Sequence, residues 1–283
     1  RGTGAGAARQ QAEEGFVSAA FGMNLTLYIA TRSGILCMFV SDKISSWGDI
    51  GRRTHALAWT PRLCGTKTDS GKGFLVCALD AGTVQVLDAE SLTPVAVLAA
   101  GHDMPEALGI GCTSDGEAAW VVYADRSLAR WSRLEEPPDW VMPTPVCGLR
   151  DIKAVPNTAP QQVLSSSERW LQLWTETSEG ICLGARATPG TQRTGDITAT
   201  ACSQHMVACG HASGEVHLLA LPSLLHLDTV PTRHAGDVLA LCFAPEPAAT
   251  AEVMPLFLAT ASKDRSAMLF RLDLQVGKVG VEA

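Results

Sequence analysis

Short apolar runs separated by tight polar turns recur along the whole chain. In "FLATASKDRSAMLFRL" (Phe257–Leu272), two apolar runs flank the charged step Lys263-Asp264-Arg265. Aspartate is rare inside strands and common in turns, so this stretch predicts a β-hairpin with Asp264 in its turn. Five other stretches have the same form, and their turns lie at Gly34, Gly82, Arg126, Glu168 and Gly214.

The predicted turns recur at a nearly regular interval. With the last turn counted at Arg265, successive turns are 48, 44, 42, 46 and 51 residues apart. Each hairpin follows one more predicted strand, at Phe16–Phe21, His55–Trp59, Ala107–Cys112, Gly148–Val155, Ile197–Cys202 and Val238–Phe243. A weaker fourth strand follows several hairpins, as at Pro94–Leu98 and Ile181–Ala187. Four short strands at this interval are typical of a β-propeller blade.

The pattern therefore predicts an all-β fold of about six blades, each with four antiparallel strands. The blades would form a fragment of one ring, or parts of two adjoining propellers. We expect a flexible linker at 1–15, blades one to three at 16–134 and blades four to six at 135–283. A junction between two propellers would fall near the proline-rich stretch 135–160. A piece cut from a ring would expose an apolar blade face and a free strand edge.

Two of the repeated units also share a set of polar and aromatic positions. Each has a histidine before its first strand, an aspartate in the second turn and an aromatic residue late in the third strand. The set comprises His234, Ser262, Asp264 and Phe270 in the sixth unit, and His102, Asp125 and Trp131 in the third. His55 and Asp80 form a weaker copy. We expect Asp264 to accept hydrogen bonds from the turn amides and from His234, which is a structural role.

These units resemble WD repeats, and their order resembles one family in particular. The segments "FLVCALDAGTVQVLDAESLTPVAVL", "DGEAAWVVYADRSLARW" and "ACGHASGEVHLLALPSLLHLDTVPTRHAGDVLALCF" are similar to consecutive blades of the double-propeller family of mitogen-activated protein kinase-binding protein 1. That family includes a related spindle-pole scaffold, and centriolar and ciliary WD-repeat proteins share the pattern. The resemblance implies a non-enzymatic protein-binding scaffold in the cytoplasm, associated with the cytoskeleton at a centrosome or cilium. Its implied partners are cytoskeletal or ciliary proteins and kinases.

Composition narrows the alternatives. A net charge of −7 and a pI near 5.5 argue against a propeller that binds nucleic acid. No run of 18 apolar residues occurs, so we expect no membrane span. Nine cysteines without a CxxC pair indicate free thiols in a reducing compartment. The chain begins "RGTGAGAARQ", without Met or a signal-peptide core, and we interpret it as part of a longer protein.

Motifs for catalysis or cofactor binding are weak, so we expect no catalytic residue and no cofactor. The stretch Gly65–Phe74 resembles a phosphate-binding loop, but its spacing and its place between two strands are wrong. A propeller enzyme, the main rival hypothesis, needs polar residues where the innermost strands begin. Those strands begin with apolar Val238, Ala107 and Ile197 instead.

Two further features concern metal and partner binding. Cys202, His205, Cys209 and His211 are zinc-type ligands close together in sequence. We expect no zinc, because a hairpin directs alternate side chains to opposite faces. Among the seven tryptophans, Trp140 in "PPDWVMPTP" is the expected exposed anchor for a partner, and the other six are expected in the core.

Overall fold

The computed structural model describes most of the chain as strands. The described residues are 16–22, 26–40, 43–62, 73–98, 105–113, 115–133, 138–144, 148–178, 180–190, 193–244, 256–275 and 278–282. Within these ranges the chain forms twenty-four β-strands and no helix. The predicted linker at 1–15 lies outside the described residues.

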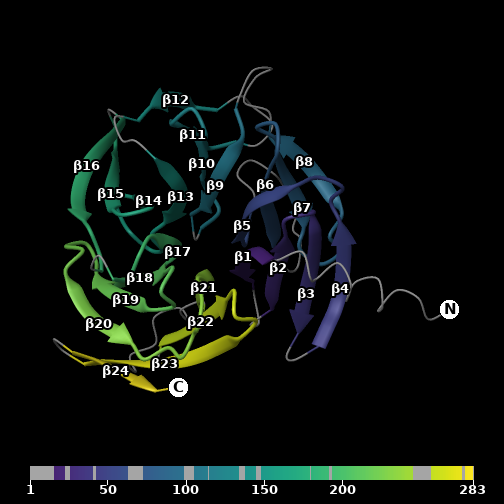
Figure 1. Ribbon diagram of the computed structural model, residues 1–283. Coiled ribbons are helices and arrows are strands. Elements are labelled where there is room, and N and C mark those ends of the chain that lie inside the picture. The colour runs from purple at the N-terminus through teal and green to yellow at the C-terminus, as the bar shows by residue number, and fades with distance from the viewer. Residues whose placement is uncertain are drawn as a thin grey trace.

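The strands form six antiparallel sheets of four, and each sheet is one blade (Figure 1). The first three blades contain β1 (Phe16–Phe21), β2 (Leu27–Thr31), β3 (Ile35–Val40) and β4 (Lys43–Asp49); β5 (Thr54–Thr60), β6 (Phe74–Leu79), β7 (Val84–Asp88) and β8 (Pro94–Leu98); and β9 (Ala107–Cys112), β10 (Ala119–Tyr123), β11 (Ser127–Trp131) and β12 (Trp140–Pro143). The last three contain β13 (Leu149–Ala154), β14 (Gln162–Ser167), β15 (Leu171–Thr177) and β16 (Gly180–Ala187); β17 (Ile197–Cys202), β18 (Met206–His211), β19 (Val216–Ala220) and β20 (His226–Val230); and β21 (Val238–Phe243), β22 (Leu256–Ser262), β23 (Ala267–Gln275) and β24 (Lys278–Glu282).

The six blades belong to one ring. Sequence order runs from the inner to the outer strand in every sheet. The inner strands β1, β5, β9, β13, β17 and β21 contact one another in turn, and β21 also contacts β1. The predicted propeller of six four-stranded blades is therefore confirmed, and of the two expected arrangements the structure has the single ring. The stretch 135–160 lies between blades three and four of that ring, and β12 belongs to blade three.

The predicted turns join the second and third strands of each blade. Their chain reversal needs backbone in the left-handed region, which glycine adopts without strain. Gly34 and Gly214 have φ of 101° and 90°, whereas Arg126 and Arg265 have φ of 74° and 70°. In the arginine-containing turns, the carboxylate of the preceding aspartate accepts hydrogen bonds from the amide and hydroxyl of the following serine.

Apolar cores lie between neighbouring blades rather than within one sheet. Five buried clusters join blades one and two, two and three, three and four, four and five, and five and six. Second strands in the middle of this series are buried on both faces, as all six residues of β6 and of β18 are. This two-sided burial explains why those strands are continuous apolar runs rather than alternating ones.

Candidate functional site: the blade-six network and the central cavity

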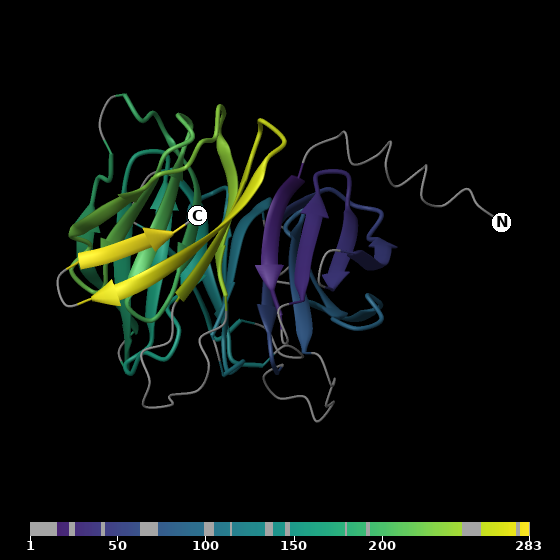
Figure 2. The ribbon, with the colours of Figure 1, turned by 90° about the horizontal axis from the view of Figure 1, so that it is seen from below.

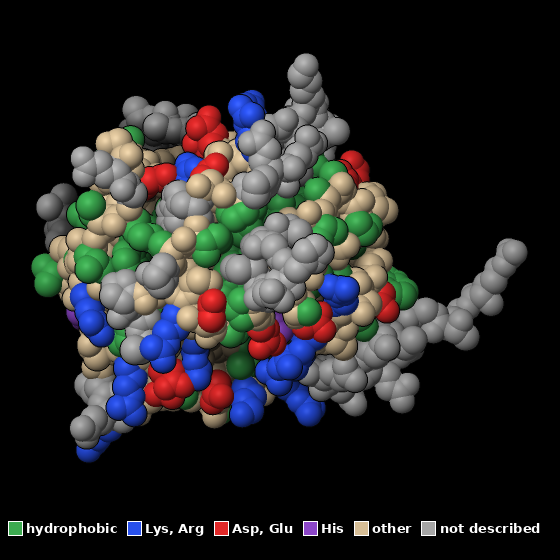
Figure 3. All heavy atoms as spheres, turned by 90° about the horizontal axis from the view of Figure 1, so that it is seen from above, with side chains coloured by type: hydrophobic (Ala, Val, Ile, Leu, Met, Phe, Trp, Pro, Cys, Tyr) green, Lys and Arg blue, Asp and Glu red, His purple; other side chains and the backbone are tan. Residues whose placement is uncertain are grey.

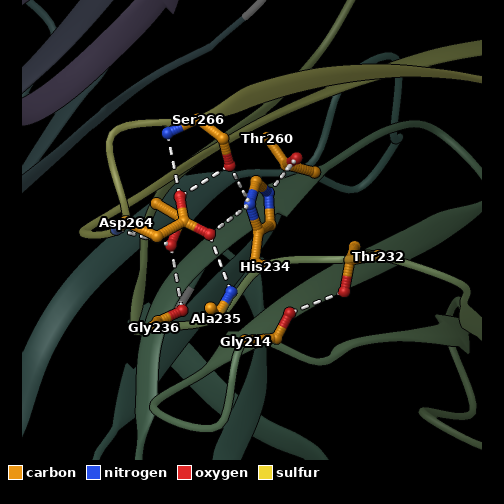
Figure 4. A network of polar contacts seen from close by, with 9 residues as sticks. Gly214, Thr232, His234, Ala235, Gly236, Thr260, Asp264 and Ser266 are labelled. Atoms are coloured by element: carbon orange, nitrogen blue, oxygen red, sulfur yellow. Dashed lines mark hydrogen bonds and ion pairs between the residues drawn. The ribbon is translucent and has the colours of Figure 1, made fainter.

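A hydrogen-bonded chain of side chains joins the second turn of blade six to the loop that enters the blade (Figure 4). The imidazole of His234 is fully buried on this loop. Its Nδ1 lies 2.7 Å from Ser266 Oγ, and its Nε2 lies 2.7 Å from Thr260 Oγ1. The Ser266 hydroxyl donates to the Asp264 carboxylate, so it accepts from His234 Nδ1–H. The Nε2 of His234 shares the second hydrogen bond of the ring with the Thr260 hydroxyl.

The Asp264 carboxylate is satisfied within the turn. It accepts from the amides of Ala235 at 2.7 Å and Ser266 at 2.8 Å, and from the Ser266 hydroxyl at 2.6 Å. The Ser266 hydroxyl and then the Ala235 amide hold the pKa of Asp264 well below its usual range, because both bonds favour the ionised form. His234 Nδ1 lies 3.6 Å from the carboxylate, so the histidine is linked to it mainly through Ser266.

The Asp264→Ala substitution is expected to lower the melting temperature by about 2–6 °C. It removes the acceptor for two amides and for the Ser266 hydroxyl, which in turn orients His234. Thermal unfolding followed by circular dichroism measures the change. Binding of any partner should fall only in proportion to the unfolded fraction. A variant with an unchanged melting temperature and lost binding would instead show that Asp264 is a recognition residue.

Other expected members of the repeated set lie in similar places. In blade three, the Asp125 carboxylate accepts from the Ser127 amide at 2.8 Å and from its hydroxyl at 2.6 Å, as Asp264 does with Ser266. Ser262 donates to the Gly236 carbonyl and accepts from the Asp264 amide. Trp131 is 1% exposed in the core between blades two and three. His102 lies outside the described residues.

The expected pairing of His55 with Asp80 is wrong. His55 lies within β5, one residue after its start, whereas His234 precedes β21 by four residues. Its Nε2 forms an ion pair with Glu106 Oε1 at 2.7 Å. Asp80 directly follows the last residue of β6, whereas Asp264 lies two residues after the end of β22. Because of these shifts in register, His55 does not occupy the position of His234, and Asp80 does not occupy the position of Asp264.

Sequence reasoning missed two members of the network, Thr260 and Ser266. Each lies two residues from a position that the pattern did identify, on the same side of its strand or turn. The recurrence of "ADRS" in blade three and "KDRS" in blade six was the available signal for the serine. Thr260 had no such signal, because Val121 occupies the corresponding position in blade three.

The expected burial of the tryptophans is correct only in part. The side chain of Trp140 lies outside the described residues, although its backbone begins β12. Trp47, which was expected in the core, is 51% exposed on β4. The expectation failed because β4 is an outer strand, and an outer strand can present large apolar side chains to solvent, as it does with Ile44 as well. Trp120, Trp131 and Trp174 are buried as expected.

A cavity of about 130 Å³ lies where the inner strands of the ring meet. Polar side chains bridge neighbouring blades around it. The Ser18 hydroxyl accepts from the Leu57 amide, and the Thr200 hydroxyl donates to Asp151 at 3.2 Å. Lys153 Nζ lies 3.2 Å from the same Asp151 carboxylate. These side chains hold the inner strands together.

Two thiols near Lys153, those of Cys202 and Cys242, lie outside the lining of the cavity and are not activated. Burial raises the pKa of Cys202 and of Cys242 to about 12, and the nearby Lys153 offsets this only in part. Both thiols are therefore protonated near neutral pH, and a thiol is a much weaker nucleophile than a thiolate. The residues that begin the inner strands, Val238, Ala107 and Ile197, are buried.

The four zinc-type ligands of blade five are separated along the sheet. Cys202 pairs opposite Val207, so Cys202, Cys209 and His211 share one face, contrary to the expected split between faces. His205 is exposed in the turn before β18, and His211 ends that strand, about 17 Å away. No group of three or more potential ligands suited to a metal ion occurs in the described ranges.

His211 is buried in contact with another histidine. Its ring is 0% exposed and lies 4.8 Å from that of His217, centroid to centroid. Nδ1 contacts the Gly195 carbonyl at 3.4 Å, and His217 contacts the Glu215 carboxylate. Burial and then the neighbouring His217 lower the pKa of His211, and the Gly195 carbonyl and Glu215 oppose this only in part.

Acidification is expected to destabilise the protein through His211. An unfolded histidine titrates near pH 6.5, whereas folded His211 titrates lower, so the unfolded state binds more protons below about pH 7. Stability should fall as pH decreases through 6.5, by up to about 1.4 kcal/mol per pH unit for one group. Urea unfolding at pH 7.5, 6.5 and 5.5 measures this slope. His211→Gln should reduce the slope, leaving the part due to His55, whose pKa is also lowered by burial. An identical slope in the variant would contradict the assignment.

Comparison with known proteins supports the propeller class. The chain is similar in structure to the β-propeller domain of Cps50 (Swd1) from Myceliophteria thermophila, with a TM-score of 0.66 and 9% sequence identity. The similarity covers 92% of this chain and 84% of that one. The chain is thus a β-propeller structurally like a WD40 propeller. No protein-family model matches the sequence, and no curated protein does. No helix in the described part of the chain has the length and hydrophobicity needed to cross a membrane.

Proposed function

We propose that this propeller is a non-enzymatic protein-binding scaffold. The observation that supports the proposal most is that large apolar side chains are exposed on outer strands, whereas polar side chains at the central cavity and in the turns are committed to structural bonds. Side chains such as Asp151, Thr200 and Asp264 are committed to bonds that hold blades and turns. By contrast, Trp47, Val97 and Leu183 are 51%, 57% and 61% exposed on outer strands. Exposed apolar side chains on a rigid surface are typical of protein-binding sites.

The rims of the disc provide a second type of binding surface. Figure 3 shows charged side chains of both signs gathered along one edge, next to a band of apolar side chains. A depression between blades one and two is lined by Arg32, Arg52 and Arg53, together with Asp80. Such a surface is suited to an acidic segment of a partner, which would add specificity and speed to association.

The finer proposal is a scaffold of a microtubule-associated assembly in the cytoplasm, at a centrosome, centriole or cilium. The resemblance of its blade order to the family of mitogen-activated protein kinase-binding protein 1 supports this assembly. Cytoskeletal or ciliary proteins and kinases are the proposed partners, without a membrane or nucleic acid. A propeller enzyme remains the competing class, and the buried apolar residues that begin the inner strands count against it.

Affinity purification with the folded chain tests the proposal. The bait should enrich a defined set of centrosomal or ciliary proteins, and a fluorescent fusion should localise to the same structure. The control bait carries Arg32→Glu and Arg52→Glu, which reverse the charge of the rim depression without altering buried residues. Substrate turnover by the purified chain would contradict the non-enzymatic part of the proposal. An enriched set without cytoskeletal proteins would contradict the proposed microtubule-associated assembly.

A further inference from the structure

The second strands of blades one and six differ from those of the other blades. In β6 and β18 every residue is buried, because each strand has a neighbouring blade on both faces. In β2 and β22 burial alternates, with Tyr28 and Leu258 fully buried and the residues beside them partly exposed. Each of these two blades is therefore covered on one face only.

The uncovered faces can be assigned from strand register. In blade one, Tyr28 and Met38 pair and point toward blade two, so their neighbours point away from it. In blade six, Leu258 and Phe270 pair and point toward blade five. The outward faces are Leu27, Ile29, Cys37, Phe39, Ile44 and Trp47 in blade one, and Phe257, Ala259, Ala261 and Leu269 in blade six. We refer to these two faces together as the sixth junction.

A β-bulge makes the blade-one face continuous out to its edge. The register between β3 and β4 shifts between Met38 and Phe39, so that Ile44 pairs with Phe39 and Trp47 with Cys37. Ile44 and Trp47 therefore lie on the same face despite their odd separation. They are 53% and 51% exposed, and Leu269 of blade six is 57% exposed.

The sixth junction has no core of its own in the described part of the chain. Each of the other five junctions contains a buried apolar cluster. At the sixth, β1 contacts β21 at the centre of the ring. Farther out, Figure 1 and Figure 2 show β3 and β4 diverging from β22 and β23. The ring is thus closed at its centre and open at its periphery.

We propose that the sixth junction binds a short antiparallel β-sheet from a partner protein, which packs between blades six and one as an additional blade. The inference rests on the proposed scaffold function and identifies the kind of partner. Most side chains on both faces are apolar and alternate along the strands, as on the faces that pack in the other five junctions, although Arg271 pairs with Phe257 on the blade-six face. Small residues, Ala259 and Ala261, allow a sheet to approach blade six closely. The occupant therefore needs two apolar faces and would continue the existing series of inter-blade cores.

Site-specific photo-crosslinking tests this inference. A photoreactive amino acid replaces Trp47, Leu269 or, as a control, Leu183, which is 61% exposed on β16 of blade four. The full chain is crosslinked in cells of its source, and the joined peptides are sequenced by mass spectrometry. Positions 47 and 269 should both crosslink to one segment of a partner, with apolar residues at alternate positions, whereas position 183 should not.

The segment found in this way is then expressed, and its affinity for the chain is measured. Trp47→Glu and Leu269→Glu should each weaken binding at least tenfold, whereas Leu183→Glu should leave it unchanged. All three side chains are more than half exposed, so the fold should tolerate these changes.

Several outcomes would overturn the inference. Crosslinks from position 47 to blade six of the same chain would show that the junction closes on itself, and crosslinks to a second copy would show self-association. Partners joined to position 183 but not to 47 or 269 would refute partner binding at the sixth junction and leave the proposed scaffold function intact. No crosslinked partner at any position, together with no enriched protein in affinity purification, would refute both. Equal binding by all three glutamate variants would also refute the inference.

Discussion

Phe270→Ala is expected to lower the free energy of unfolding by about 3–5 kcal/mol. The Phe270 ring is 0% exposed in the core that joins blades five and six. Its removal leaves a cavity between two sheets, because the rigid strands on either side can close around the site only in part. Urea unfolding followed by tryptophan fluorescence measures the loss.

Phe257 provides a matched control in the same sheet. It lies one strand away, on the opposite face of blade six, and is 37% exposed at the sixth junction. Phe257→Ala should cost less than about 1 kcal/mol, because little packing is lost at a partly exposed position. Equal losses from the two substitutions would mean that the sixth junction is packed in solution, and would contradict the open arrangement.

The strand pattern was predictable because hairpin chemistry is local. Apolar runs and turn residues follow directly in sequence, so β1, β8, β9, β17 and β21 begin and end where the pattern placed them. The resulting count of six blades needed no knowledge of distant contacts. Predicting the closure of the ring did need knowledge of distant contacts, because one ring and parts of two rings have the same local pattern.

The network was predictable only in part, because its contacts depend on register. Asp264 and His234 could be found from turn chemistry and from the repeated unit. Thr260 could not, because its hydroxyl matters only through its place opposite the buried imidazole. A shift of one residue for Asp80 and of five residues for His55 made these two a false copy. Single-residue register is invisible to a pattern that tolerates variable loop lengths.

The uncovered faces at the sixth junction could not be located from sequence. The strand "LYIAT" of blade one is mostly apolar, as is the doubly buried strand "FLVCAL" of blade two. Hydrophobicity shows that a face can be buried, whereas only the arrangement of blades shows whether it is. A fragment of a ring was expected to expose such a face, and the ring here does so at its periphery.

Gly214→Ala is expected to destabilise the protein by about 2–4 kcal/mol, because it combines backbone strain with a steric clash. Gly214 has φ of 90°, and a Cβ at this position would press against the backbone carbonyl oxygen of His234. The same turn accepts a hydrogen bond from Thr232 at the Gly214 carbonyl (Figure 4). The loop that carries His234 would therefore have to move away from the turn.

Gly148→Ala separates the two contributions. Gly148 also has positive φ, 74°, but no atom lies within 4 Å of an added Cβ. This variant should lose only the part of the unfolding free energy that comes from backbone strain, about 1–2 kcal/mol.

Hydrogen exchange supplies a local readout, because the Ala235 amide donates to Asp264 next to His234. Its exchange should accelerate in Gly214→Ala beyond the change in global stability, and should follow global stability in Gly148→Ala. Equal unfolding energies and equal exchange in the two variants would show that the turn of blade five does not hold the His234 loop in place.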